Sequence, residues 1–428
     1  MASTGDLRIA KESSLSPRGR GSGRGGPHRI TIIGGSLAGL MAGNLFHRIG
    51  WDVHIFERTD GVLEGRGAGI TILPGLIETF RACGVDEQAY GIMLPERIAL
   101  DRSGNIVAQR AFAQEMTSWR RLFEMLKAVF PAERYHSGVT LERIEQNADK
   151  VTAHFAGGES VDADLLIGAD GLRSTIRSQF LPDAKPYYPG YIAWRCLADE
   201  TALSAATHAK LFGRYTVCVA PGQQGIGYPV PGPDHSIALG KRQYNVVWYQ
   251  PVREVDELPR LLTDDNGRYH PNGIPPSLIS ARVRAEMVEI AEEVLAPQFA
   301  EAIRRARLYF FQPIYDLELP RLMFGRVIIV GDAAFIARPH VAMGVPKAGG
   351  DVLALVEACK RGGDEYMTEL PAFEAERLRV GGAIVSRGKY LGSYMEAQLK
   401  SDEERRRAEE QRVPEQVMME TAAPMKYD

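Results

Sequence analysis

The sequence has little of what marks several large classes of protein. Its 428 residues include 4 cysteines, at positions 83, 196, 218 and 359, and none of them has C-x-x-C or other metal-ligand spacing. This argues against a disulfide framework or a zinc site and favours free thiols in a reducing compartment. No apolar run approaches the roughly 18 residues of a membrane span. The net charge of −3 offers no broad basic field for nucleic acid or an anionic membrane.

The N-terminal segment, residues 1–28, lacks the apolar side chains that a core needs. It is rich in glycine, serine and arginine and has no apolar stretch typical of a signal peptide. We predict a disordered tail here and a cytoplasmic location for the chain; contact of these arginines with RNA is the alternative. The rest is ordinary for a globular protein, with 45% hydrophobic and 25% charged residues.

The most informative stretch is residues 29–57. A β-branched run, Ile30 to Ile33, ends at a glycine-rich turn; a helical pattern follows from about Leu37 to Ile49, and a second strand, Val53 to Phe56, ends on Glu57. This order, with an acid about 20 residues beyond the turn, is typical of a dinucleotide-binding unit. The alternative is a structural strand–helix turn that binds no ligand.

The turn departs from the G-x-G-x-x-G pattern, because Ser36 stands where the second glycine belongs. Serine is small enough to let a pyrophosphate approach, and its hydroxyl can donate to it. The helix N-terminus offers free N–H groups and a partial positive charge to phosphate. Glu57 is expected to accept hydrogen bonds from ribose hydroxyls, and its charge disfavours a 2′-phosphate there.

Two further segments pair a buried strand with an acid at its end. Leu165 to Gly171 contains Asp170, and Val327 to Ala334 contains Asp332. An acid at the carboxyl end of a parallel strand lies where α/β folds bind ligands, although a helix N-cap explains any single one of them. The repetition favours one shared ligand site at the edge of a parallel sheet.

Between these segments the composition changes. Residues 187–250 are rich in tyrosine, tryptophan and valine, with strand-like runs near 191–197, 210–219 and 245–249. This predicts a mostly antiparallel sheet inserted into a Rossmann-like α/β domain.

Helical patterns follow over 279–305, from about 345, and over 371–412, whereas 256–278 is predicted as loop. The predicted organisation is therefore a tail (1–28), a nucleotide-binding domain in two parts (29–184 and 279–370), an inserted sheet domain (185–278) and a C-terminal helical segment (371–428).

Taken together, GGSLAGL, GADGLRSTIR and GDAAFIARPHVAMGVPKA resemble the nucleotide motifs of flavin-dependent aromatic hydroxylases, the single-component FAD monooxygenases with a para-hydroxybenzoate-hydroxylase-like fold. The resemblance spans about residues 29–395. Loop stretches such as LEGRGAGI and TSWRRLF are most similar to the 2,6-dihydroxypyridine 3-hydroxylase type. The resemblance implies that the two-part domain binds FAD, that the inserted sheet binds the substrate, and that NAD(P)H is a transient co-substrate.

The resemblance also assigns FAD contacts position by position. They are Gly34, Gly35, Ser36, Ala38, Gly39, Glu57, Arg58, Arg66, Arg120, Asp170, Asp332, Gly344 and Val345. Glu57 would hold the adenosine ribose and Asp332 the ribityl chain. The N-terminus of the helix that begins near Val345 would face the pyrimidine edge of the flavin. The glycine-rich loop 65–69 would accommodate a flavin that moves between reduction and oxygenation.

Some of these positions depart from the family pattern. Trp119 stands where an arginine usually reaches the cofactor, so we expect Arg120 or Arg121 to replace it; the alternative is that this contact is absent. Pro346 has no N–H and replaces a residue that often contacts the flavin, which leaves the Val345 N–H as the candidate.

On the substrate side, the resemblance places the Pro339 carbonyl beside the substrate hydroxyl. His340 could relay a proton near neutral pH, and an exposed loop histidine is the alternative. Ala342 stands where the family has glycine, and Lys347 is expected to be a solvated helix charge. Tyr228 is a further catalytic candidate. Because strands turn alternate residues toward a pocket, only some of the following sheet residues are expected to face the ring: Tyr191, Trp194, Arg195, Tyr228 and Trp248.

We therefore predict an FAD-dependent monooxygenase that hydroxylates a hydroxypyridine or phenolic ring with NAD(P)H and O2 through a C4a-hydroperoxyflavin. This chemistry needs a site that favours the deprotonated ring and excludes water. The alternatives are another FAD oxidoreductase on the same fold, such as an epoxidase or reductase, and a catalytically silent flavin-binding protein. No metal is predicted. A homo-oligomer is compatible with the family, and segment 401–412 is expected to be a solvated helix face.

Overall fold

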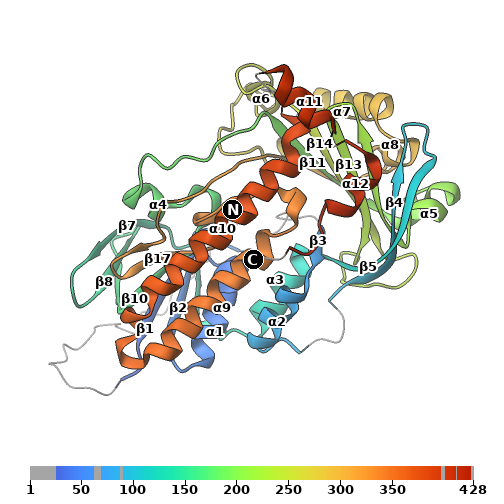
Figure 1. Ribbon diagram of the computed structural model, residues 1–428. Coiled ribbons are helices and arrows are strands. Elements are labelled where there is room, and N and C mark those ends of the chain that lie inside the picture. The colour runs from blue at the N-terminus through green and yellow to red at the C-terminus, as the bar shows by residue number, and fades with distance from the viewer. Residues whose placement is uncertain (1–25, 62–68, 87–89, 397–400, 411, 426–428) are drawn as a thin grey trace, which may run out of the picture.

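A computed structural model describes residues 26–61, 69–86, 90–396, 401–410 and 412–425 (Figure 1). These residues form two large sheets, one small sheet and a set of helices, and each large sheet is built from segments far apart in the sequence. The predicted α/β fold with an added, mostly antiparallel sheet and C-terminal helices is confirmed.

The first sheet has six strands in the order β16-β17-β10-β1-β2-β6. Its strands are β1 (Arg29–Ile33), β2 (Asp52–Glu57), β6 (Tyr135–Ser137), β10 (Leu165–Gly168), β16 (Met323–Phe324) and β17 (Val327–Ile329). All neighbours are parallel except β16 and β17. The strands that lead into the glycine-rich turn, Asp170 and Asp332, namely β1, β10 and β17, are neighbours in the sheet, so their carboxyl ends meet at one edge.

Both faces of this sheet are covered, which explains its near-continuous apolar strands. One face packs against α1 (Leu37–Arg48), α2 (Pro74–Ala82), α3 (Trp119–Ala128) and α9 (Gly344–Gly362). The other packs against a small sheet of β7 (Leu141–Gln146), β8 (Val151–Phe155) and β9 (Ser160–Ala163), with α4 (Thr175–Phe180) beside it. Gly43 on α1 sits so close to β2 that a Cβ there would lie 2.6 Å from Ile55 Cδ1.

The second large sheet has eight strands in the order β15-β11-β14-β13-β12-β4-β5-β3. They are β3 (Gly69–Ile72), β4 (Ile92–Leu100), β5 (Ile106–Ser118), β11 (Tyr191–Asp199), β12 (Arg214–Ala220), β13 (Gln223–Val230), β14 (Gln243–Pro251) and β15 (Leu308–Pro313). Neighbours are antiparallel except β4 and β12. The sheet takes in β3, β4, β5 and β15 from outside residues 185–278, so it is wider than the predicted inserted domain, whose boundaries stay a prediction.

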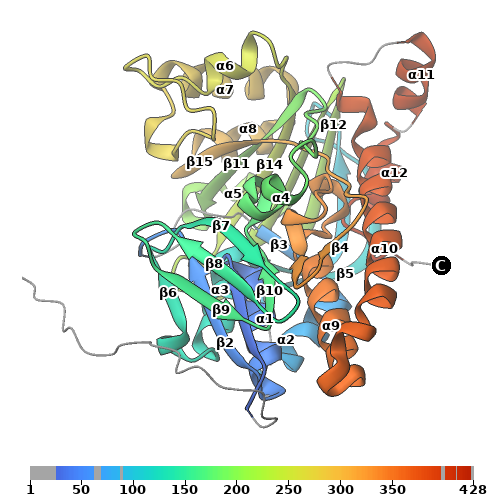
Figure 2. The ribbon, with the colours of Figure 1, turned by 90° about the vertical axis from the view of Figure 1, so that its left-hand side faces the viewer.

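The two faces of the second sheet differ in what covers them (Figure 2). Trp194 and Trp248 point to the face under α7 (Ala281–Val294) and α8 (Pro297–Arg304). The opposite face, here called the inner face, carries Tyr191, Ala193, Tyr215, Val217, Ile226, Tyr228, Val247 and Tyr249. Alternation along β11 and β14 decides which residues belong to it.

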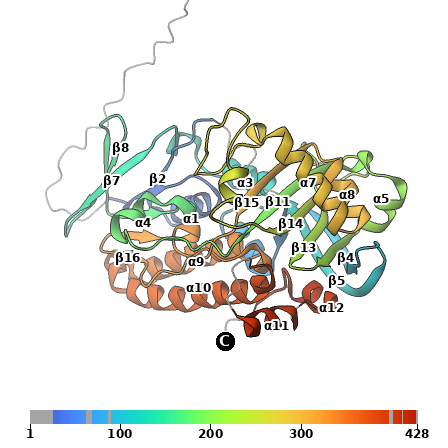
Figure 3. The same ribbon diagram turned by 90° about the horizontal axis from the view of Figure 1, so that it is seen from above.

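The C-terminal helices join the two parts of the molecule. The long helix α10 (Leu370–Gly392) runs beside α9 and continues toward the second sheet (Figures 1 and 3). In α11 (Asp402–Glu410) only Ala408 is buried, which confirms the predicted solvated face. α12 (Pro414–Glu420) packs on β4, β5 and β12. Among the described helices, none is long and apolar enough to cross a bilayer.

Two local predictions were wrong. Lys210 lies in a short helix, α5 (Ala205–Leu211), and the strand predicted from there begins only at Arg214. Ser204 explains the helix, because its hydroxyl accepts from the N–H of Thr207 as an N-cap. The stretch 256–278, predicted as loop, contains α6 (Glu257–Leu261).

Candidate functional site

The glycine-rich turn between β1 and α1 requires glycine at two positions. Gly34 has φ +102°, and a Cβ there would lie 2.3 Å from the carbonyl oxygen of Ala169, at the end of β10. A Cβ on Gly39 would lie 1.8 Å from the carbonyl oxygen of Gly34. Both distances are far below van der Waals contact, so the turn can fold tightly against β10 only because side chains are absent there.

The N-terminus of α1 is open to an anion. Ser36 is its N-cap, yet its hydroxyl makes no capping bond within the described residues, and the first turn contains no acid. The hydroxyl and the first-turn N–H groups are therefore free to bind phosphate oxygens, with the helix dipole adding attraction.

Glu57 is held in place at the end of β2. It is buried, with one carboxylate oxygen accepting from Gly35 N–H at 2.8 Å and the other from Thr59 N–H at 2.9 Å. Each oxygen keeps a second lone pair for a ligand hydroxyl. Tyr135 also contacts this turn, since its hydroxyl donates to the Gly35 carbonyl at 2.9 Å, and no sequence motif marked it.

A cavity of about 180 Å³ lies at the carboxyl ends of β1, β2 and β10. It brings together five of the residues predicted to contact the cofactor, namely Gly34, Ser36, Glu57, Arg58 and Asp170. It adds others that the sequence did not single out, among them Thr140, Arg173 and Thr175.

Asp170 is the acid that the end of β10 contributes to this cavity. Burial raises the pKa of its carboxyl group, opposed by hydrogen bonds from Ser174 and nearby backbone N–H groups. Its Oδ2 accepts from Ile176 N–H at 3.3 Å, whereas the buried Oδ1 has no hydrogen-bond partner among the described residues. A buried oxygen without a partner is rare in native structures, and a ligand that donates to it is the simplest explanation.

The turn carrying Asp332 (Gly331–Ala333) is fixed from beneath by charged side chains. Lys347 donates to the carbonyl oxygens of Gly331, at 2.8 Å, and Phe335. Asp351 accepts from Gly331 N–H at 3.1 Å, and Arg177 donates to the Ala333 carbonyl at 3.0 Å.

The prediction that Lys347 is a solvated helix charge is wrong, because its side chain is 0% exposed. It lies on the side of α9 that packs against the Asp332 turn, where the carbonyl oxygens of Gly331 and Phe335 accept hydrogen bonds from its ammonium group. Asp332 itself is 55% exposed and 3.6 Å from the Lys347 Nζ, so its carboxylate is fixed in position but accessible.

Other predicted cofactor residues are not brought into the cavity. Arg120 pairs with Glu124 at 2.7 Å on the surface of α3, and Arg121 donates to the carbonyl of Tyr90 at 3.0 Å. Arg66, with Gly65 and Gly67, lies outside the described residues.

Two more of the predicted positions, Gly344 and Val345, form the first turn of α9. Ala38 on α1 lies where α1, α9 and the Asp332 turn meet. A Cβ on Gly331 would lie 3.2 Å from the Cβ of Ala38 and 3.5 Å from the Cβ of Ala348. The roles of these residues toward FAD stay predictions.

His340 is buried rather than exposed, so the alternative of an exposed loop histidine is wrong. Its Nε2 lies 3.1 Å from the Tyr191 hydroxyl, and its ring centroid is 4.1 Å from that of Tyr249. Burial lowers the pKa of the imidazole well below its usual value, and the positive charges of Arg338 and Arg195 lower it further. This favours a neutral imidazole near neutral pH, and the proton relay through His340 stays a prediction.

The turn that carries Pro339 and His340 is held on one side by an ion pair and on the other by a backbone hydrogen bond. Arg338 forms a buried ion pair with Asp316, with Nη2 2.7 Å from Oδ2. On the other side, Ala422 N–H, just after α12, donates to the His340 carbonyl at 2.8 Å. Neither contact could be read from the motif, because both partners are distant in the sequence.

Only some of the predicted aromatic residues lie on the inner face of the second sheet. Tyr228 is on it, and its hydroxyl donates to the Gly69 carbonyl at 2.9 Å. Tyr191 is on it too, whereas Trp194 and Trp248 point away and donate to Gln250 and Gln223. The two tryptophans therefore do not face a ring bound there.

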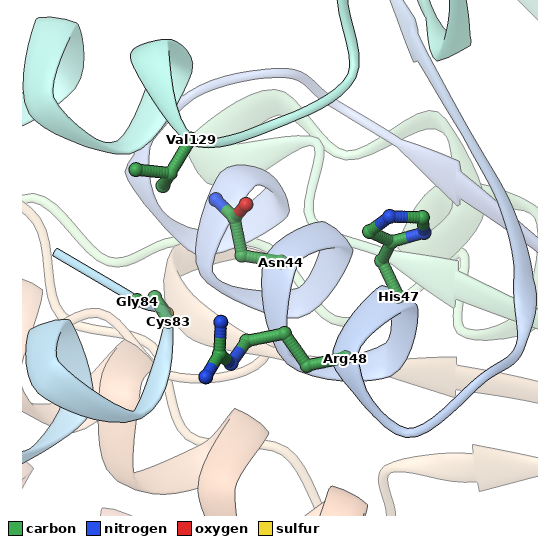
Figure 4. Close-up of a pocket in the computed structure, with 6 residues that line it drawn as sticks. All are labelled: Asn44, His47, Arg48, Cys83, Gly84 and Val129. Carbon is green, nitrogen blue, oxygen red and sulfur yellow. The ribbon is translucent and has the colours of Figure 1, made fainter.

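A second hollow, of about 600 Å³, lies at the other end of α1 (Figure 4). It is lined by Asn44, His47, Arg48, Cys83, Gly84 and Val129. The glycine-rich turn is at the N-terminus of α1, whereas Asn44, His47 and Arg48 lie in the second half of this helix. The hollow is therefore separate from the nucleotide cavity.

Comparison with known families matches two adjoining regions of the chain. Residues 28–185 match a family described as FAD binding domain, and residues 188–316 match one described as FAD binding domain-like. The first region holds the glycine-rich turn, Glu57 and Asp170, and the second holds most of the inner face.

Individual relatives cover most of the chain. A 2,6-dihydroxypyridine 3-monooxygenase of Paenarthrobacter nicotinovorans is 28% identical, covering 86% of this chain and 91% of its own. A 3-hydroxybenzoate 6-hydroxylase of Polaromonas naphthalenivorans is 25% identical, covering 86% and 88%. A 6-hydroxynicotinate 3-monooxygenase of Bordetella bronchiseptica is 25% identical, covering 79% and 84%.

Two solved structures are similar to this chain over most of its length. The 2,6-dihydroxypyridine-3-hydroxylase from Arthrobacter nicotinovorans superposes with a TM-score of 0.81 at 27% identity, over 87% of this chain and 94% of that one. Klebsiella pneumoniae HpxO, solved with FAD and uric acid, superposes with a TM-score of 0.72 at 21% identity, over 91% and 93%. The second likeness concerns the fold alone.

Proposed function

Because this chain belongs to the flavin-dependent aromatic hydroxylases, we propose that it uses NAD(P)H and O2 to hydroxylate the ring of a hydroxypyridine or a phenol. The observation that carries this proposal is one short segment, residues 331–342. It leaves the parallel sheet at Asp332, beside the nucleotide cavity, and reaches the inner face of the second sheet at His340. A cofactor cavity and a buried aromatic face are thereby joined.

The residues present fit FAD. The glycine-rich turn is a cradle that any Cβ would fill, the Ser36 hydroxyl and the first-turn N–H groups of α1 suit a pyrophosphate, and Glu57 suits a ribose. The Asp170 Oδ1 still lacks a donor among the described residues. When bound, FAD supplies the transfer of electrons from NAD(P)H and the activation of O2.

The work left to the protein is to hold the ring oxygen in a reactive, deprotonated state. Burial raises the pKa of Tyr191 well above its usual value, so the phenol keeps its proton and can donate a hydrogen bond to His340 Nε2, which lies 3.1 Å from its oxygen. The neutral imidazole then carries its hydrogen on Nδ1, a buried atom without a partner among the described residues. A hydrogen-bond donor at that position stabilises a negatively charged ring oxygen.

The substrate class follows from the relatives. Those quoted above are named for 2,6-dihydroxypyridine, 3-hydroxybenzoate and 6-hydroxynicotinate, which share a hydroxylated six-membered aromatic ring. Pro339, next to His340, is proposed to contribute its carbonyl oxygen beside the ring hydroxyl, and Tyr228 to line the ring from the sheet.

The test uses the purified full-length protein with FAD bound. Oxidation of NADH and NADPH is followed spectrophotometrically with a panel of hydroxypyridines and phenols, and products formed under ¹⁸O2 are weighed by mass spectrometry. The expected result is substrate-stimulated oxidation and a product heavier by one labelled oxygen. Oxidation without oxygen insertion would favour another FAD oxidoreductase such as a reductase, and no stimulation by any aromatic would favour a silent flavin-binding protein.

A further inference from the structure

Polar atoms without partners gather on the inner face of the second sheet. They are the Nε of Arg195, both amide atoms of Asn245 and the Nδ1 of His340, and none of them has a hydrogen-bond partner among the described residues. Asn245 and His340 are 0% exposed. Native proteins rarely leave buried donors and acceptors unpaired, because such groups lose their hydrogen bonds to water without gaining others in the protein. Such a cluster indicates a polar ligand that completes these bonds.

Strand register places two of these residues next to each other. Asn245 on β14 is directly opposite Tyr228 on β13, and Arg195 on β11 is directly opposite Val247, two residues along β14 from Asn245. Tyr228 and Val247 belong to the inner face, so Arg195 and Asn245 also point to it. The Arg195 guanidinium also lies close enough to the Tyr228 phenol to oppose the rise that burial causes in its pKa.

The charge of Arg195 has no counter-ion in the described part of the chain. Two other arginines near this face are paired: Arg338 with the carboxylates of Asp316 and Glu396, and Arg97, through its two terminal nitrogens, with the carbonyls of Met418, Thr421 and Ala422 and the side chain of Gln114.

No described carboxylate pairs with Arg195. The groups around it stay neutral, because burial raises the pKa of the Tyr228 and Tyr249 phenols and lowers that of His340. A partly buried cation among neutral groups calls for an anionic ligand atom.

We propose that Arg195 and Asn245 bind the cyclic-amide edge of a hydroxypyridine in its pyridone form, an inference that rests on the proposed function. The Asn245 side chain offers one donor and one acceptor, which match the adjacent C=O and N–H of a ring lactam. The Arg195 Nε–H donates to the ring oxygen that carries negative charge. A phenol offers no ring N–H and leaves the Asn245 carbonyl unpaired.

The sharpest test compares two probes that differ in one ring atom: 2,6-dihydroxypyridine and resorcinol, which has C–H in place of the ring nitrogen. Dissociation constants are measured from the change in flavin absorbance of the FAD-loaded full-length protein, together with KM and kcat. We expect the wild-type protein to bind the pyridine at least about 10-fold more tightly, the scale of one or two neutral hydrogen bonds.

Substitutions at the two residues have different expected results. Asn245→Leu should bring the ratio of the two dissociation constants close to 1 while leaving resorcinol binding within about threefold. Arg195→Met should weaken both probes by about 10- to 100-fold, as expected for a lost bond to a charged group, with partial recovery in Arg195→Lys. Arg282→Met, on α7 with a side chain 83% exposed, is the matched control and should bind both probes as the wild type does.

The outcomes separate this inference from the proposed function. If the wild-type protein responds to both probes but Asn245→Leu keeps the preference for the pyridine, or Arg195→Met binds both normally, the inference fails and the proposed function stands. If neither these probes nor any other aromatic stimulates NAD(P)H oxidation in the wild-type protein, the proposed function fails and this inference with it. Should Asn245→Leu not fold, the isosteric Asn245→Asp replaces it. That variant adds a counter-ion for Arg195, so it must weaken both probes.

Discussion

The nucleotide cavity and the inner face of the second sheet are built in opposite ways. The cavity uses backbone N–H groups, glycines and acids from short segments that end neighbouring strands, so each contributor is close in sequence to a strand end. The inner face uses side chains from β11, β12, β13 and β14, and the turn at His340 and the segment after α12 complete its surroundings. The first is fixed by local motifs, whereas the second exists only after distant segments pack together.

The largest expected effect tests the local half of this comparison. Gly39 lies in α1, where alanine suits the backbone, but a Cβ there would lie 1.8 Å from the Gly34 carbonyl oxygen. Overpacking typically costs about 1–3 kcal/mol, and contact with backbone leaves little room to relax. We expect Gly39→Ala to raise the dissociation constant for FAD by about 100-fold or more, measured as FAD absorbance per protein after gel filtration.

The matched control for this substitution is Gly50→Ala. Gly50 has φ +87° but nothing within 4 Å of a Cβ, so alanine there should cost only about 1 kcal/mol of stability and leave FAD bound. If Gly39→Ala retains FAD like the control, the tight turn is not what holds the cofactor.

This contrast also explains which features the sequence predicted. The glycine-rich turn, the acids at the strand ends, the central strands and α1 were predicted from patterns within about 30 residues, and all of them are present in the structure. The burial of Lys347 and His340 was missed, because it depends on contacts that form only in the folded chain. Lys347 is buried against the Asp332 turn. His340 is surrounded by Tyr191, Tyr249 and the segment after α12. Lysine and histidine at loop and helix positions are usually exposed, so composition points the wrong way there.

Arg195 and Asn245 show where prediction from the sequence stops on the substrate side. The sequence identified strands near both residues, but whether a strand residue faces the ring depends on register, and a shift of one position reverses every side chain. Only the pairing of β11 with β14 and of β14 with β13 shows that the two residues share the inner face while Trp194 and Trp248 do not.

The next prediction tests whether the inner face can be disrupted without the nucleotide cavity. Arg338→Met leaves Asp316 buried without its partner, and breaking a buried ion pair from one side costs about 3–5 kcal/mol. We expect this loss in the free energy of unfolding, measured with urea, while FAD content stays normal in native buffer.

The double variant Arg338→Met, Asp316→Leu provides the control for that experiment. It removes the buried Asp316 charge together with Arg338, and the remaining partner of Arg338, Glu396, is 20% exposed, so the double variant should recover much of the lost stability. Loss of FAD from the single variant at a urea concentration where it is folded would show that the two regions are coupled rather than separate.

A smaller effect concerns pH. The pKa of His340 is lower in the folded protein than in the unfolded chain, so below about pH 6.5 the unfolded chain binds the extra proton and folding loses stability as the pH falls. The loss approaches about 1.4 kcal/mol per pH unit for this group. We expect His340→Asn to flatten part of this dependence between pH 6.5 and pH 5, measured as urea midpoints across that range.

Two other histidines set the background for this measurement. His54 and His136 also have pKa values lowered by burial, so they keep contributing in the His340 variant and the slope should fall without vanishing. His54→Asn is the matched control, because it should lower the slope less than His340→Asn does: its ring is only partly buried, and the adjacent Asp52 carboxylate opposes the effect of burial. An unchanged slope in the His340 variant would mean that the imidazole is not desolvated.

The smallest expected effect asks how firmly distant contacts hold the substrate turn. Ala342 has φ +53°, a left-handed conformation that costs a non-glycine residue roughly 1–2 kcal/mol and that the contacts of Arg338 and Ala422 nevertheless maintain. Glycine removes this strain but adds freedom to the unfolded chain, which offsets part of the gain. We expect Ala342→Gly to raise the free energy of unfolding by about 0.5–1 kcal/mol without changing KM. The alanine methyl group also packs against the cluster of the inner face. A rise in KM, or a loss of stability, would therefore show instead that this side-chain contact, rather than backbone strain, decides the identity of this residue.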